Sequence, residues 1–177
     1  NLKQERFDEA ITSFKKILDF CVENSGKKSD ETKEALNNLV ICYNQKGEYY
    51  AKRDRFEDAI NTIDKAIEIT NDMGIETETA KSAKKNIAKI QALFAFNQIN
   101  KGLYDSAISN LKKILDMTLQ IYGNDSEEYI DARNNLIKGY NSKGKNLLEK
   151  SRYDDAISAF EKSVELGKDE KNYSKHF

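Results

Sequence analysis

The sequence predicts an all-α fold, an α-α superhelix of about seven antiparallel helices that stack in sequence order. One pattern occurs four times: an aromatic residue, an acidic residue, any residue, alanine and isoleucine, with the alanines at Ala10, Ala59, Ala107 and Ala156. Such regular self-similarity is typical of one supersecondary unit that is copied along the chain. The 177 residues also contain no proline, where ordinary usage would give about nine. Long, uninterrupted helices are therefore favoured.

The four pentapeptides mark the second helix of each repeat. They begin at Phe7, Phe56, Tyr104 and Tyr153. Apolar residues follow at helical spacing, three, four and seven positions along, which places them on one face. The alanine on that face is small enough to let a neighbouring helix approach closely.

Longer first helices are expected over about 30–53, 77–100 and 126–150. The first of them has a start signal at Ser29, followed by two acidic residues, and the last has acidic residues in its first turn. Short linkers with turn residues, such as Gly26, Gly74 and Gly102, separate the helices.

The spacing of the alanines divides the chain into a half repeat at 1–28, repeats at about 29–75, 76–124 and 125–168, and a tail at 169–177. We expect these parts to form a single solenoid domain over 1–177. The alignment puts Asn1 opposite Leu147, so we expect Asn1 and Leu2 to belong to the last turn of a first helix whose body is missing. We therefore interpret the chain as a fragment of a longer protein.

Composition argues against several classes of partner. The formal net charge is −1, and the basic residues are spread evenly, so we expect neither a nucleic acid nor a membrane as partner. No apolar run is long enough to span a bilayer. Cys21 and Cys42 both lie in helical apolar runs, which favours reduced packing residues in a cytoplasmic protein, with a disulfide or a reactive thiol as the alternative.

No catalytic motif is visible in the sequence. There is no glycine-rich phosphate loop, and no set of residues has metal-ligand spacing. The one histidine, His176, lies in the tail, which leaves no Ser-His or Cys-His pair for nucleophilic catalysis. We expect no enzyme, no metal and no cofactor in this chain.

The stretch 47–59 resembles the tetratricopeptide repeat, in which a glycine, two aromatic residues and an alanine recur in this order and spacing. Gly144, Leu147, Tyr153 and Ala156 follow the same order. The repeat here is longer than usual, and 36–39 and 133–136 look like the long repeats of kinesin light chain. The resemblance implies a tetratricopeptide solenoid whose first helices line a concave groove that binds a protein or peptide partner. One repeat departs from the pattern, since Ala95 replaces the glycine.

One asparagine recurs in the first helices. Asn38, Asn86 and Asn135 each lie 21 residues before the alanine of their repeat, and Asn38 lies opposite the apolar face. The resemblance implies a ladder of asparagines that hydrogen-bond the backbone of an extended peptide. The alternative is that they are surface residues aligned by chance.

Further along the same face the repeats diverge. Gln45 and Glu48 correspond to Leu93 and Phe96, so an apolar pair interrupts a polar line. We expect this pair to anchor a partner in the groove; alternatively, both residues pack on neighbouring helices. The candidate partner-binding set is completed by Lys89 and Lys138, which either meet an acidic ligand residue or are solvated, and by Asn141.

These observations favour a scaffold for protein–protein interaction. Two alternatives from other classes stay open. The chain could be the regulatory arm of a larger enzyme, such as a protease or a nucleotide-binding switch. It could also be a structural strut that self-associates through its open solenoid ends.

Overall fold

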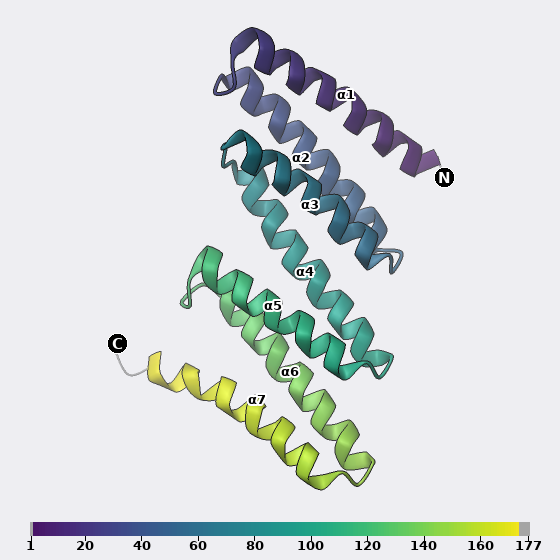
Figure 1. The fold of residues 1–177 in the computed structure, drawn as a ribbon, viewed down its shortest axis with the longest axis vertical. Coiled ribbons are helices and arrows are strands. Elements are labelled where there is room, and N and C mark those ends of the chain that lie inside the picture. The colour runs from purple at the N-terminus through teal and green to yellow at the C-terminus, as the bar shows by residue number, and fades with distance from the viewer. Residues whose placement is uncertain (1, 174–177) are drawn as a thin grey trace. The chain divides into compact units, whose positions relative to one another are not determined.

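The computed structural model describes residues 2–173, which form seven α-helices and no strand (Figure 1). The helices are α1 (Leu2–Ser25), α2 (Asp30–Ala51), α3 (Phe56–Met73), α4 (Glu78–Asn100), α5 (Tyr104–Tyr122), α6 (Glu127–Glu149) and α7 (Tyr153–Tyr173). The predicted all-α class and the number of helices are confirmed over this range. Three of the four pentapeptides coincide with the first residue of a helix, because α3, α5 and α7 begin at their aromatic residues.

The chain divides into two compact units, Asn1–Ile90 and Gln91–Phe177. In the first unit α2 packs on both α1 and α3, and in the second unit α6 packs on both α5 and α7. Helix α4 contributes its N-terminal part to the first unit and its last turns to the second. Within each unit, consecutive helices run antiparallel (Figure 1).

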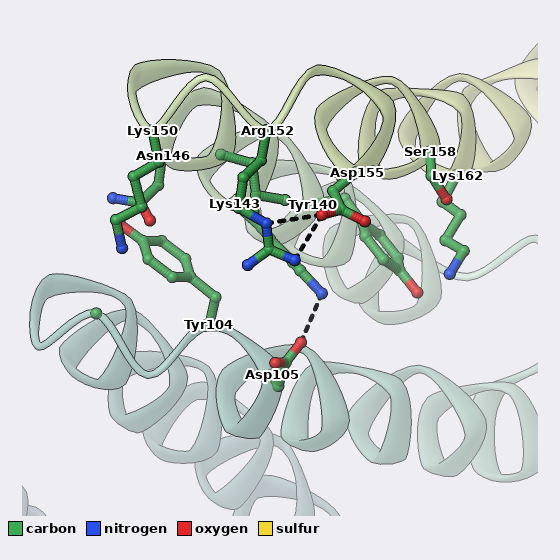
Figure 2. Close-up of a pocket in the computed structure, with 13 residues that line it drawn as sticks. Tyr104, Asp105, Tyr140, Lys143, Asn146, Lys150, Arg152, Asp155, Ser158 and Lys162 are labelled. Carbon is green, nitrogen blue, oxygen red and sulfur yellow. Dashed lines mark hydrogen bonds and ion pairs between the residues drawn. The ribbon is translucent and has the colours of Figure 1, made fainter.

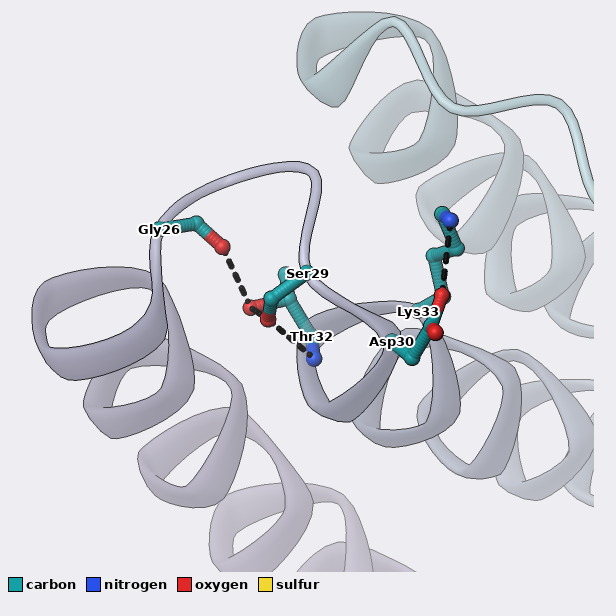
Figure 3. A network of polar contacts seen from close by, with 5 residues as sticks. All are labelled: Gly26, Ser29, Asp30, Thr32 and Lys33. Carbon is teal, nitrogen blue, oxygen red and sulfur yellow. Dashed lines mark hydrogen bonds and ion pairs between the residues drawn. The ribbon is translucent and has the colours of Figure 1, made fainter.

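The turns that lead into the first helices share one construction. Each has a glycine with positive φ and, three residues later, a hydroxyl that accepts a hydrogen bond from a backbone N–H in the first turn of the helix. The glycine and hydroxyl pairs are Gly26 with Ser29, Gly74 with Thr77, and Gly123 with Ser126. The glycine adopts a backbone conformation that other residues disfavour, and the hydroxyl satisfies an N–H group that has no partner within the helix. Figure 3 shows the first of these turns, where Thr32 also donates to the carbonyl of Gly26.

The turns inside each repeat place a single residue at positive φ. The three equivalent residues are Asp54 at 57°, Gly102 at 78° and Ser151 at 57°. Each lies five positions before the alanine of its pentapeptide. Glycine occupies only one of these positions, so the other two turns hold an ordinary residue in a left-handed conformation.

Helix α1 departs from the sequence-based expectation. Residue Leu2 was expected in the last turn of a preceding first helix, but α1 runs without a break from Leu2 to Ser25. Glu5, the counterpart of Asp54, has no positive φ. Residues 2–6 satisfy their backbone hydrogen bonds as part of α1, and no turn separates them from the pentapeptide at Phe7.

The core follows the predicted apolar faces. Leu36, Leu39 and Ile63 are fully buried in the first unit, and Leu111 is fully buried in the second. The face of α2 that the sequence assigned to the core is confirmed, because Leu36, Leu39, Tyr43, Gly47 and Tyr50 are all buried. Leu147, Ala156 and Ala159 form a buried cluster against which Phe160 packs.

Both cysteines are free thiols, Cys21 half-buried and Cys42 buried. The structure holds both in the reduced form that the sequence favoured. His176 lies outside the described residues. Within residues 2–173, no helix is long and apolar enough to cross a membrane, and no group of three or more histidine, cysteine, aspartate or glutamate side chains is arranged to hold a metal ion.

Candidate partner-binding surfaces

An open pocket of about 440 Å³ lies between α1 and α2 in the first unit. Its lining includes Phe7, Ala10 and Phe14 from α1, together with Asn38, Ile41, Cys42 and Gln45 from α2. The pocket exists because the apolar face of α1 is only half covered. The equivalent residues of α3, Phe56, Ala59 and Ile63, are buried, and Ile63 lies against Gly47 of α2.

Two of the sequence-predicted residues, Asn38 and Gln45, meet at this pocket. Asn38 is half-buried and Gln45 is exposed. Among the described residues neither side chain makes a hydrogen bond to the protein, so both amides are available at the edge of an apolar floor. Ile41 lies between them on α2 and is 41% exposed.

The next two candidates lie in the part of α4 that belongs to the first unit. Asn86 is half-buried, and its amide donates to the Glu48 carboxylate over a long distance of 3.4 Å. Its carbonyl oxygen is an acceptor that this contact does not use. Lys89, one turn further along α4, is exposed.

The remaining candidates belong to the second unit. Leu93 and Phe96 come from the last turns of α4, where Leu93 is 55% exposed and Phe96 is half-buried. Helix α6 carries the others: Asn135 and Asn141 are half-buried, and Lys138 is exposed. The expectation that Leu93 and Phe96 act as one anchor stays a prediction, and their burial makes Leu93 the more accessible of the two.

The sequence analysis missed an ion pair that occurs once in each unit. Lys46 of α2 contacts Asp8 of α1 at 2.5 Å, and Lys143 of α6 contacts Asp105 of α5 at 2.6 Å. Each pair joins a first helix to the acidic residue of the pentapeptide in the second helix before it. The signal was present in the sequence, because the two residues are 38 positions apart in both cases.

The first unit surrounds this ion pair with aromatic rings and cations. The ring centroids of Tyr49 and Tyr50 are 5.9 Å apart, and the Arg53 guanidinium lies 3.7 Å from the Tyr49 centroid. Arg55 lies 4.4 Å from the Tyr50 centroid. Burial acts to lower the pKa of Lys46, but its contacts with Asp8 and Tyr50 outweigh burial and raise that pKa.

The second unit has a polar pocket of about 270 Å³ in the equivalent place, bounded by α5, α6 and α7. We call it the α6–α7 pocket. Figure 2 shows Lys143 and Arg152 pointing into its centre, where they contact Asp105 and Asp155 respectively. Tyr104, Tyr140, Leu147, Lys150 and Lys162 also line it.

Two segments of the chain match a known repeat family. The family model described as tetratricopeptide repeat matches residues 40–73 and 137–169. These two segments match the tetratricopeptide repeat. Each match covers about the C-terminal half of a first helix, the turn with a non-glycine residue at positive φ, and most or all of the following helix. Tetratricopeptide repeats are in general scaffolds for protein–protein interaction.

The solved structures that match this chain include two of nearly identical TPR-like repeats from Podosopora anserina that are assigned to kinesin light chain. One is 9% identical, covers 96% of this chain and 91% of that chain, and has a TM-score of 0.31. The other is 8% identical, covers 90% of each chain, and has a TM-score of 0.32. BtubC (BKLC) from P. vanneervenii is 14% identical, with a TM-score of 0.37; the match covers 98% of this chain but only 59% of that one. No curated protein matches this chain in sequence.

Proposed function

We propose that this chain binds segments of a partner protein through exposed residues of its first helices, α2 and the start of α4 in the first unit, and the end of α4 and α6 in the second. The proposal is supported by the asparagines at one position of each helix, Asn38, Asn86 and Asn135, none of which is fully buried. An amide offers a donor and an acceptor together, so it can pair with peptide backbone whatever the sequence of the peptide.

The observation that carries the proposal is the pocket between α1 and α2. It joins an apolar floor, which includes Phe14 and Ile41, to the free amides of Asn38 and Gln45. Binding sites commonly combine apolar surface, which supplies affinity, with a few polar groups that fix orientation. In this proposal a bulky apolar side chain of the partner fills the pocket while its backbone pairs with Asn38.

The second unit offers a further apolar contact at Leu93. Its side chain is 55% exposed on α4, at the position that Gln45 holds in α2. Phe96 is half-buried and contributes a smaller accessible area. The exposed amines of Lys89 and Lys138 favour a partner segment that has acidic residues near its apolar anchors.

Selection of peptides from a display library, followed by calorimetry on the full chain, tests this surface. Peptides selected on the chain should bind the Asn38→Ala and Ile41→Asp variants at least about thirtyfold more weakly, the loss expected at a hot spot. The matched control is Ile157→Ala, because Ile157 is 55% exposed but lies on a second helix. Equal affinities for the chain and for both first-helix variants would exclude the proposed surface.

A second measurement separates binding from folding at the apolar pair. Leu93→Ala should weaken a selected peptide and leave the melting temperature unchanged, because the side chain is mostly exposed. The Phe96→Ala variant tests whether Phe96 belongs to the core or to the binding surface. A loss of about 3 to 5 kcal/mol in the free energy of unfolding is typical of a core phenylalanine, and would remove Phe96 from the binding surface.

A further inference from the structure

We propose that the α6–α7 pocket receives the side chain of a tyrosine from an acidic segment of a partner, in the place that Tyr50 occupies in the first unit. This site lies at the turn between α6 and α7, around the start of α7. It is therefore separate from the first-helix residues of the proposed function and does not depend on them.

The two units differ at this place in only a few residues. Tyr50 lies nine positions before Ala59, and Leu147 lies nine positions before Ala156. The residue just before this position is also aromatic only in the first unit: it is Tyr49 there and Asn146 in the second unit. The second unit thus lacks two aromatic rings that the first unit has at the end of its first helix.

The charged residues around the lost rings are retained. The cation and carboxylate that contact each other across the helices are Lys46 with Asp8 in the first unit and Lys143 with Asp105 in the second. The arginine at the start of the second helix is held by the aspartate three residues later in both units, Arg55 by Asp58 and Arg152 by Asp155.

In the first unit these cations hold an aromatic ring. The Tyr50 side chain is buried, with the Arg55 guanidinium 4.4 Å and the Lys46 amine 5.6 Å from the ring centroid. Both distances lie within the range of favourable cation–π interaction. The first unit thus contains, within its own chain, the kind of group that this arrangement of cations accepts.

In the second unit the same two cations border an open space. Lys143 and Arg152 remain fixed by their carboxylates, and the shorter Leu147 leaves a pocket of about 270 Å³ (Figure 2). That volume is slightly below the range of about 300 to 1,000 Å³ that is usual for small-molecule sites. A single side chain therefore suits the pocket better than a larger ligand.

The charge of the lining specifies the ligand further. Lys150 and Lys162 line the pocket in addition to Lys143 and Arg152, so four cations face two carboxylates, Asp105 and Asp155. The excess positive charge favours a ring with a polar, electron-rich oxygen and with acidic neighbours. Tyrosine between acidic residues combines these properties, whereas phenylalanine offers a ring face but no oxygen to which the lysines can donate.

The test is an NMR titration of the full chain with acetyl-Glu-Tyr-Glu-amide, with acetyl-Glu-Ala-Glu-amide as the matched control peptide. The tyrosine peptide should shift the backbone amide signals of Lys143, Leu147 and Arg152, and the alanine peptide should not. Equal shifts with both peptides would reduce the site to simple anion binding and overturn the proposal. The absence of shifts with either peptide would also overturn it.

Two reciprocal substitutions make the test specific. Leu147→Tyr supplies the missing ring, so it should abolish binding of the tyrosine peptide. Tyr50→Leu should create a second site, with new shifts at Lys46 and Arg55. Unchanged binding by a folded Leu147→Tyr variant contradicts the proposal.

If Leu147→Tyr does not fold, the Arg152→Gln variant tests the proposal instead. Arg152 is exposed at the surface of the pocket, so its substitution should leave the fold intact. It should weaken the tyrosine peptide about fivefold, the effect of losing one exposed cation–π contact. Unchanged affinity would again overturn the proposal. Because signals of Asn38, Asn86 and Asn135 report the first-helix surface separately, failure of one proposal can be told from failure of the other.

Discussion

Gly144 of α6 lies directly against the ring of Phe160 of α7: a methyl group on this glycine would come within 2.7 Å of the Phe160 Cε1 atom. Gly47 and Ile63 have the same relationship in the first unit, where the added carbon would lie 2.5 Å from the Ile63 Cγ1 atom. Each glycine lies twelve positions before the alanine of its repeat, and each large residue lies four positions after it. The missing side chain therefore lets a first helix pack closely on the second helix of the same repeat.

We predict that Gly47→Ala destabilises the protein by about 1 to 2 kcal/mol. Overpacking in a core costs about 1 to 3 kcal/mol, and alanine recovers up to about 1 kcal/mol through its higher helix propensity. The clash should prevail, because Ile63 is fully buried and the Ala59 carbonyl would also lie only 3.2 Å from the added carbon. Chemical denaturation gives the measurement.

Gly167→Ala is the matched control for that prediction. Gly167 lies in α7, and an added carbon there meets no atom within 4 Å. Only the gain in helix propensity remains, so this variant should be as stable as the unchanged chain or slightly more stable. If Gly47→Ala behaved in the same way, close helix packing would not explain the glycine.

A second prediction concerns the turns inside the repeats. Ser151→Gly should stabilise the protein by about 0.5 to 1 kcal/mol. A left-handed conformation costs an ordinary residue about 1 to 2 kcal/mol, and the greater entropy that glycine loses on folding offsets only part of this gain. Gly102→Ala should have the opposite effect, since an alanine there meets no clash but inherits φ of 78°. Melting temperatures of the two variants, measured side by side, should move in opposite directions.

A third prediction concerns the two thiols. Burial raises the pKa of Cys42 above its ordinary value and outweighs the opposing charge of the nearby Lys46 amine, and Asp8 acts in the same direction as burial. Since the thiolate is the reactive form, iodoacetamide at pH 8 should modify the half-buried Cys21 before Cys42. Peptide mass spectrometry measures the order. In denaturant the two rates should become equal; faster labelling of Cys42 in the folded protein would contradict the assigned burial.

The fourth prediction uses the pH dependence of Asp64 in α3. Burial, and then the charge of Glu68, raise the pKa of its carboxyl above 3.8. The folded state thus favours the protonated form, and this stabilising contribution is present at low pH and lost as the pH rises through the raised pKa. Asp64→Asn should therefore raise the melting temperature at pH 7 and have little effect at pH 3. Asp116→Asn, at an exposed aspartate of α5, serves as the control and should change neither value.

The helices could be predicted because their signals are local. The aromatic start of α3, the hydroxyl cap at Ser29 and the breaking glycine at Gly74 each act within a few residues of the chain. The extension of α1 to Leu2 was missed because the expectation rested on alignment with the other repeats. Whether the backbone turns at a position depends on the helices that pack around it, and an alignment of repeats contains no information about those neighbours.

The candidate surfaces were harder to predict than the fold. The positions of Asn38 and Gln45 followed from helical periodicity, but the apolar floor beneath them comes from α1 and depends on what covers Phe14. The α6–α7 pocket arises from a difference between repeats, Tyr50 against Leu147, rather than from a shared motif. Comparing the repeats for shared residues does not reveal this pocket. Comparing them for an aromatic ring that one repeat lacks would reveal it.

The packed pairs α1–α2, α2–α3, α5–α6 and α6–α7 are all neighbours along the chain. Contacts of this kind need only short loops to close, and chains in which local contacts dominate fold on a timescale of about microseconds to milliseconds. Each turn is also stabilised by its own residues, as Ser29 is bound to Thr32. A helix pair can therefore complete its structure as soon as both helices have left the ribosome, before the rest of the protein has been synthesised.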